Sequence, residues 1–141
     1  MKEIIVMYEF EVPGKITGKA RPRVNTETGR AYTPASTKEY ELLIKQYFKI
    51  KYPRYEILQG RIAVKIIACF AIPKSTSQKQ KTLMLENKIS PTKKPDIDNI
   101  VKIILDALNK MAFKDDSQIT KIQVEKLYAE EEKIKINLEE Y

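Results

Sequence analysis

The segment KKPDIDNIVKIILDALNK, residues 93–110, decides much of the fold because a regular helical pattern begins in it directly after Pro95. Apolar side chains recur there every three or four positions, as on one face of an amphipathic helix. They are Ile97, Ile100, Val101, Ile104, Leu108 and, just beyond the segment, Met111. Its polar side carries Asp98, Lys102, Asp106 and Asn109. The pattern predicts a helix that begins after Pro95 and buries one face.

Outward from this helix, apolar and polar residues alternate in several stretches, as in half-buried strands. In residues 3–12 the apolar face holds Ile4, Val6, Tyr8, Phe10 and Val12. In residues 60–72 it holds Ile62, Val64, Ile66, Ala68, Phe70 and Ile72. Toward the C-terminus, Ile122 and Val124 belong to one strand, and Ile134, Ile136 and Leu138 to another. The acidic run at residues 130–132 is expected to form the turn between these last two.

A further helix is expected before Pro53, where Tyr40, Leu43, Ile44 and Tyr47 fall at helical spacing. Pro34 suits its first position, and Ser36 with Glu39 could form a capping box. Residues 13–33 carry turn signals and predict a loop or a small hairpin. Residues 74–94 are rich in lysine and predict a partly mobile surface segment with a short helix around residues 78–86.

The order β-α-β-(α)-α-β-β predicts a single α+β domain spanning residues 1–141, with helices packed on one face of a mixed sheet. The length of 141 residues is enough for one hydrophobic core. No apolar run reaches the roughly 18 residues of a membrane span, and the N-terminus does not resemble a signal peptide. With one cysteine the chain offers no internal disulfide, so a cytoplasmic location is expected.

The chain contains no histidine, which excludes Ser–His and Cys–His triads and the usual zinc sites. Its formal charge of +7 is unevenly distributed. Residues 1–95 hold 19 Lys and Arg against 8 Glu, whereas residues 96–141 hold 7 Lys against 11 acids. A basic protein of this kind is typical of those that bind nucleic acid. The alternative is that the excess lysine only keeps the protein soluble.

All five aspartates lie within residues 96–116, and the other fourteen acids are glutamates. Pro95 favours a break at Asp96, so that Asp96 caps the helix and Asp98 sits in its first turn. Both carboxylates would then face one point, and Lys102 would lie one turn further along. Asp115 and Asp116 follow on a loop after the helix, and Asp116 would join the first pair if that loop folds back or if the following strand runs alongside the helix.

Three carboxylates around one point would hold Mg²⁺, and a pair of metals could flank a scissile phosphate. Lys102 could neutralise charge on the transferring phosphate. Each acid also has an ordinary structural alternative. Asp96 could be only a cap, Asp98 could only complement the helix dipole, and residues 115–117 could be a plain turn. Asp106 is interpreted as structural because it lies two turns beyond Asp98.

Three groups of residues carry a resemblance to a known family. They are Lys94-Pro95-Asp96-Ile97-Asp98-Asn99-Ile100 with Lys102; Leu105-Asp106-Ala107-Leu108; and Lys114-Asp115-Asp116-Ser117-Gln118-Ile119. With the basic motif Gly18-Lys19-Ala20-Arg21-Pro22-Arg23, they resemble the signature of RusA-type Holliday junction resolvases. The resemblance implies a homodimeric, Mg²⁺-dependent endonuclease of DNA recombination and repair, of a kind frequent in bacteria and prophages, with Mn²⁺ as an alternative ion.

By position, the resemblance implies that Asp96, Asp98 and Asp116 are the catalytic, metal-binding carboxylates and that Lys102 is the essential lysine. Whether Asp115 also contributes stays open. The expected substrate is a four-way DNA junction, cut by paired symmetric nicks. Its backbone phosphates would contact Lys15, Lys19, Arg21, Arg23, Arg30, Lys74, Lys79, Lys81, Lys93 and Lys94. The alternatives are a non-catalytic basic DNA-binding module and a less selective Mg²⁺-dependent nuclease on branched DNA.

Overall fold

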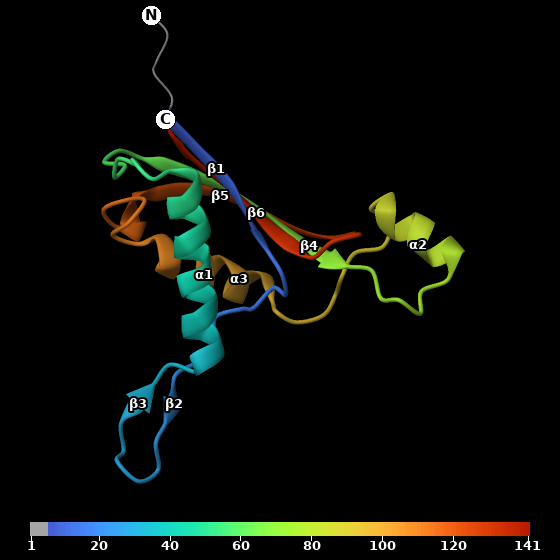
Figure 1. Cartoon of the computed structure of the whole chain (residues 1–141), viewed down its shortest axis with the longest axis horizontal. Helices are drawn as coiled ribbons and strands as arrows, with labels where there is room; N and C mark the ends of the chain where they lie inside the picture. Colours follow the sequence, from blue (N-terminus) through green and yellow to red (C-terminus); the bar gives the residue numbers. More distant parts are fainter. Residues whose placement is uncertain (1–5) are drawn as a thin grey trace, which may run out of the picture.

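The computed structural model describes residues 6–141, so the predicted strand position Ile4 lies outside the described residues. The strands are β1 (Val6–Pro13), β2 (Arg23–Val24), β3 (Ala31–Tyr32), β4 (Ile62–Ala71), β5 (Ile119–Ala129) and β6 (Lys133–Glu140). The helices are α1 (Ala35–Lys51), α2 (Gln78–Leu85), α3 (Ile97–Leu108) and the 3₁₀ turn η1 (Asp116–Gln118). This order confirms the predicted α+β domain (Figure 1).

Four strands form one mixed sheet in the order β1-β6-β4-β5. β6 is antiparallel to both β1 and β4, whereas β4 and β5 run parallel. The two C-terminal strands follow one another in the sequence but do not pair, because β4 lies between them. This arrangement leaves β1 and β5 as the two edges of the sheet.

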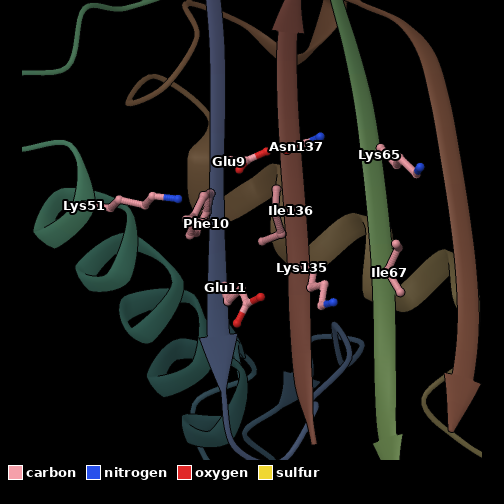
Figure 2. Close-up of a pocket in the computed structure, with 9 residues that line it drawn as sticks. All are labelled: Glu9, Phe10, Glu11, Lys51, Lys65, Ile67, Lys135, Ile136 and Asn137. Atoms are coloured by element: carbon pink, nitrogen blue, oxygen red, sulfur yellow. The ribbon is translucent and has the colours of Figure 1, made fainter. Parts of the chain in front are cut away.

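The core lies between the sheet and the helices α1 and α3, which are seen behind the strands in Figure 2. The predicted inward faces of the strands are confirmed by the burial of Phe10, Ile66 and Ile136. In α3 the buried stripe is rotated from the predicted one: Ile103 and Ala107 are buried, whereas Ile97 is 45% exposed. Ile97 is the first helical residue and lies at the margin of this stripe.

Helix α1 ends at Lys51, before Pro53 as predicted, but it begins differently. Pro34 is the residue before the helix, and it provides no side-chain hydrogen bond to the first turn. The predicted capping box is therefore wrong. Ser36 is already inside the helix, where it cannot act as the preceding cap residue.

Two surface segments extend from this body. Residues 13–33 contain the short β2–β3 hairpin, which projects beyond the first turn of α1 (Figure 1). Residues 74–94 contain α2 within the predicted range, and α2 has no buried residue. Among the residues described by the structure, no helix has the length and apolar character needed to cross a bilayer.

Candidate active site

The start of α3 presents two exposed carboxylates, as the sequence predicted. Asp96 precedes the helix with an extended backbone, and its carbonyl accepts the first helical hydrogen bond from Ile100 N–H at 3.0 Å. The Asp96 carboxylate forms no capping hydrogen bond, and Asp98 follows in the first turn. Neither carboxylate has an ion-pair partner within residues 6–141. Both are therefore accessible to a ligand from solvent.

The segment containing the basic N-terminal motif packs directly on this helix start. Lys19 N–H donates to the Asn99 carbonyl at 2.9 Å. A Cβ atom added at Gly18 would lie 2.6 Å from Pro95 Cβ and 3.1 Å from Asn99 Cβ. Only glycine therefore permits the observed contact. This close approach was not predicted from the sequence, although the glycine inside a basic motif was visible there.

Lys19 does not project freely toward solvent. Its ammonium lies 2.6 Å from Glu41 Oε1 and 3.1 Å from Asp106 Oδ2. Burial lowers the pKa of Lys19, but hydrogen bonds to the two carboxylates outweigh it, so the pKa is raised above its ordinary value. This pairing ties α1 to α3. Lys19 is thus a structural cation in this structure, unlike the free phosphate contact that was expected.

Lys102 lies one turn beyond Asp98 and is 62% exposed. Its Nζ atom is 3.4 Å from both carboxylate oxygens of Asp106. Exposed pairs of this kind contribute little stability, so the lysine can leave Asp106 for another anion. Asp106 holds both Lys19 and Lys102, which supports its predicted structural role.

The two aspartates after α3 have different surroundings. The Asp115 carboxylate accepts a hydrogen bond from Ser117 N–H at 3.1 Å and caps the 3₁₀ turn. Hydrogen bonding to Ser117 is also the main cause of a lowered pKa of Asp115. Gln118 anchors this turn through its side-chain amide, which donates to the carbonyls of Leu58 and Gly60. Asp115 therefore has a local role, whereas the Asp116 carboxylate has no such capping contact.

The structure does not bring the predicted acids together within one copy of the chain. Across residues 6–141, no three acidic, cysteine or histidine side chains are grouped closely enough to hold a metal ion. Asp96 directly precedes α3, a helix about 18 Å long at ~1.5 Å per residue. Asp116 begins η1, which follows the other end of the helix, where Phe113 pairs with Asn109. Within a single chain, the loop after α3 therefore does not bring Asp116 to Asp96 and Asp98. β5 begins after Asp116 and runs parallel to β4, so the residues that return toward the start of α3 are those of β5 and not Asp116.

A hollow of about 620 Å³ adjoins the start of α3. Its lining includes three of the predicted DNA contacts, Lys15, Lys93 and Lys94, together with Glu132. The Glu132 carboxylate accepts hydrogen bonds from Ile16 N–H at 2.9 Å and Ala71 N–H at 3.2 Å. Glu132 therefore fixes the loop after β1 against the end of β4. The sequence suggested only a turn residue there.

The other predicted DNA contacts lie on the two projecting segments. Arg21, Arg23 and Arg30 belong to the region of the β2–β3 hairpin and are exposed. Lys74, Lys79 and Lys81 lie on or before α2 and are accompanied there by Glu130, 4.0 Å from Lys81 Nζ. Both segments project from the body of the domain (Figure 1). A separate hollow on the open sheet face is lined by glutamates, lysines and apolar side chains but by no aspartate (Figure 2).

Comparison with known proteins agrees with these features. The sequence model of the endodeoxyribonuclease RusA family matches residues 13–139. A relative from Bacillus subtilis (strain 168), the uncharacterized protein YqaN, is 32% identical over 139 residues, which cover 94% of this chain and 95% of the relative. The match extends from the end of β1 to the last strand, so it includes both ends of α3. The chain therefore belongs to the RusA family of endodeoxyribonucleases.

Proposed function

We propose that this protein is a Mg²⁺-dependent endonuclease that resolves four-way DNA junctions by paired symmetric nicks. The observation that carries the proposal is the exposed pair Asp96 and Asp98, which forms no ion pair with any residue that the structure describes although the chain is strongly basic. Carboxylates left free in this way are suited to a hard divalent cation. Membership of an endodeoxyribonuclease family gives that site a DNA phosphate as its substrate.

The side chains at the start of α3 fit magnesium in kind and number. Mg²⁺ is commonly held by one or two carboxylates and keeps water and phosphate oxygens as its other ligands. Asp96 and Asp98 would hold the ion, which would supply Lewis-acid activation at the scissile phosphate. Lys102 would contact a phosphate oxygen after leaving Asp106, since its pairing with Asp106 is long and exposed. Its charge would stabilise negative charge that develops on the phosphate during cleavage.

The DNA would be held by the basic surfaces on either side of this site. Lys15, Lys93 and Lys94 line the hollow next to Asp96. The hairpin arginines extend the same charge away from the body. Contacts of this kind bind phosphates irrespective of sequence, and their strength falls as the salt concentration rises. They favour a substrate recognised by its shape, such as a branched junction.

The substrate also favours a homodimer. A four-way junction has two-fold symmetry, and two matched cuts require two sites related by the same symmetry. A dimer further offers a way to complete the acidic site, because Asp116 is remote from Asp96 in its own chain. We therefore propose that Asp116 of the partner subunit joins Asp96 and Asp98.

The proposal is tested by incubating the protein with a labelled four-way junction, a matched duplex and a flap, each with Mg²⁺ and with EDTA. We expect symmetric nicks in two opposing strands of the junction, lost in EDTA and absent from the duplex. Equal cutting of flap and junction would indicate a less selective nuclease. Junction binding without nicks in Mg²⁺ or Mn²⁺ would indicate a non-catalytic DNA-binding module.

A further inference from the structure

A cluster of two cations around one aromatic ring lies at the end of the sheet where β4 and β5 begin and β6 ends, which is the end marked C in Figure 1. The Arg61 guanidinium carbon lies 4.1 Å from the centroid of the Tyr141 ring, and Lys121 Nζ lies 4.6 Å from it. Arg61 directly precedes β4, Lys121 lies in β5, and Tyr141 follows β6. Three separate segments of the chain therefore converge on one ring.

Hydrogen bonds fix the position of this ring. Tyr141 N–H donates to the Arg61 carbonyl at 3.2 Å, and Arg61 Nε donates to the Tyr141 carbonyl at 3.0 Å. The Tyr141 hydroxyl lies 2.6 Å from Thr120 Oγ1. Thr120 has no partner on β4, because the register skips one residue of β5 between Ile62 and Ala63. An irregularity of this kind turns the adjacent side chains of a strand, which accounts for the approach of the next residue, a lysine, to the ring.

The two cations of this cluster lack an acidic partner. Arg61 and Lys121 are exposed, and neither forms an ion pair with a carboxylate of residues 6–141. Contact with an aromatic face is a weak attraction at an exposed site, and the ring carries no net negative charge. The cluster thus holds two positive charges in a fixed place without neutralising them. A guanidinium fork beside an ammonium group matches the oxygens of a phosphate, which would supply the missing negative charge.

Open space adjoins the cluster on the open face of the sheet. On β4 the small residue Ala63 aligns with Lys121 of β5 and with Glu139 of β6. A hollow of about 470 Å³ lies there, and its polar lining consists of Lys65, Lys121, Gln123, Asn137 and Glu139. In this lining two lysines and two amides outweigh the single carboxylate. The hollow therefore favours an anionic, hydrogen-bonding ligand over an apolar one.

We propose that Arg61, Lys121 and Tyr141 form a DNA-binding site in which the two cations, positioned by the ring, bind one backbone phosphate. The sugar and base next to that phosphate would lie over the hollow beside Lys121. DNA is the phosphate-bearing polymer on which an endodeoxyribonuclease acts, so we assign the phosphate to DNA. The three residues meet only because β4 pairs with both β5 and β6, and the sequence alone did not single them out.

The site lies beside the turn that carries Asp116, and this step rests on the proposed function, in which Asp116 is a metal-binding acid. The Gln118 side-chain amide anchors that turn by donating to the Gly60 carbonyl at 2.8 Å. Gly60 directly precedes Arg61, and Gln118 lies three residues before Lys121. A strand bound by both cations would therefore run past Asp116. The lysines at the start of α3 would hold DNA beside the other two acids.

The phosphate contact is tested by the salt dependence of DNA binding, measured in EDTA by fluorescence anisotropy with a labelled four-way junction and a duplex. Each phosphate contact contributes about 0.9 to the slope of log affinity against log salt concentration on duplex DNA. The double variant Arg61→Gln/Lys121→Gln should bind about tenfold more weakly, with a slope that is smaller by about one. Lys49→Gln removes an exposed lysine from the last turn of α1 and is the matched control, whose slope should equal that of the wild type. An unchanged slope in the double variant would overturn the proposal.

The role of the ring is tested by two variants that leave the net charge unchanged. Tyr141→Phe keeps the aromatic face and loses only the hydroxyl contact to Thr120, so its DNA affinity should stay within about twofold of the wild type. Tyr141→Leu removes the face that positions both cations and should weaken binding about fivefold. Thermal unfolding of both variants checks that the fold is intact. Equal affinity of the leucine and phenylalanine variants would show that the ring has no part in the site.

Two further comparisons separate this proposal from its alternatives. Inorganic phosphate, added at the same ionic strength as a sodium chloride control, should displace DNA no better than chloride. Stronger displacement by phosphate from the wild type, but not from Arg61→Gln/Lys121→Gln, would assign the site to free phosphate instead of DNA. Binding in EDTA does not depend on cleavage, so a failed nuclease assay would leave a reduced slope valid. Normal cleavage by the wild type with an unchanged slope in the double variant would reject this site and retain the proposed function.

Discussion

The two ends of α3 carry the same residue type in opposite circumstances. At the start, Asp96 and Asp98 are exposed and form no ion pair within residues 6–141. Toward the other end, Asp106 binds two lysines and Asp115 caps a turn through Ser117, whereas Asp116 is exposed and has no such contact. Aspartates that bind other protein groups stabilise the fold, whereas aspartates without such partners can bind a metal ion. The difference identifies which acids to change in order to separate activity from stability.

The largest effect on cleavage is expected at the start of α3, where Asp96 and Asp98 form no ion pair. Asp96→Asn removes a proposed metal ligand, and loss of such a ligand costs several kcal/mol of transition-state stabilisation, so junction cleavage should fall by more than about a hundredfold. Junction binding should stay equal or tighten, because a negative charge near the phosphates is lost. Cleavage rates and fluorescence anisotropy measure the two quantities. Glu9→Gln, on the open sheet face, is the control that should change neither quantity. Wild-type cleavage by Asp96→Asn would exclude Asp96 from the chemistry.

Mixing two inactive variants tests whether the ends of α3 meet across a dimer. Asp96→Asn and Asp116→Asn should each be inactive alone. In a mixed dimer one site holds both substitutions and the other holds neither, if each site takes Asp116 from the partner subunit. Random exchange should therefore restore about a quarter of the sites, seen as single nicks in the junction. If each chain builds its own site, mixing restores nothing.

Gly18→Ala tests whether the segment that contains Gly18 must pack closely on the start of α3. The new methyl group would lie 2.6 Å from Pro95 Cβ, so the segment or the helix start must shift. Overpacking of this kind costs about 1–3 kcal/mol, and we expect a lower Tm together with slower cleavage. Gly60→Ala is the matched control, since its methyl group would meet only the movable end of the Glu140 side chain. An equal loss of stability in both variants would contradict the proposed contact.

Asp106→Asn tests the acid that pairs with two lysines near the C-terminal end of α3. It weakens the contacts to Lys19 and Lys102 without changing the size of the side chain. We expect a loss of about 1–2 kcal/mol in the free energy of unfolding, measured by urea denaturation. Cleavage per folded molecule should change much less than in Asp96→Asn. A cleavage defect as large as that of Asp96→Asn, in a protein of normal stability, would place Asp106 in the chemistry.

The smallest effect is expected at Asp115. Its pKa is lowered in the folded state, so its stabilising contribution is present above the unfolded pKa and is lost as the pH falls through the folded pKa. Asp115→Asn should therefore flatten the acid limb of the stability curve below about pH 4. Thermal unfolding between pH 2 and pH 7 measures this slope. An unchanged slope would show that the hydrogen bond to Ser117 does not favour the charged form.

Local features were sufficient for much of the outline. Pro95 and Asp96 predicted where α3 begins, because a proline and a cap residue act within one helical turn. Alternation predicted the inward faces of β1, β4 and β6, since side chains of a strand point to opposite sides in turn. The concentration of aspartates in a basic chain singled out the acids. Each of these signals depends on neighbours in the sequence.

The tertiary structure decided how these parts meet. It placed β6 between β1 and β4, set β5 parallel to β4, and left the β5 edge open. It also paired Lys19 with Asp106 and separated Asp116 from Asp96 by the length of α3. Periodicity reports which face of an element is buried but not which element covers it. Strand order and the distance between acids depend on packing between remote segments, which no local pattern encodes.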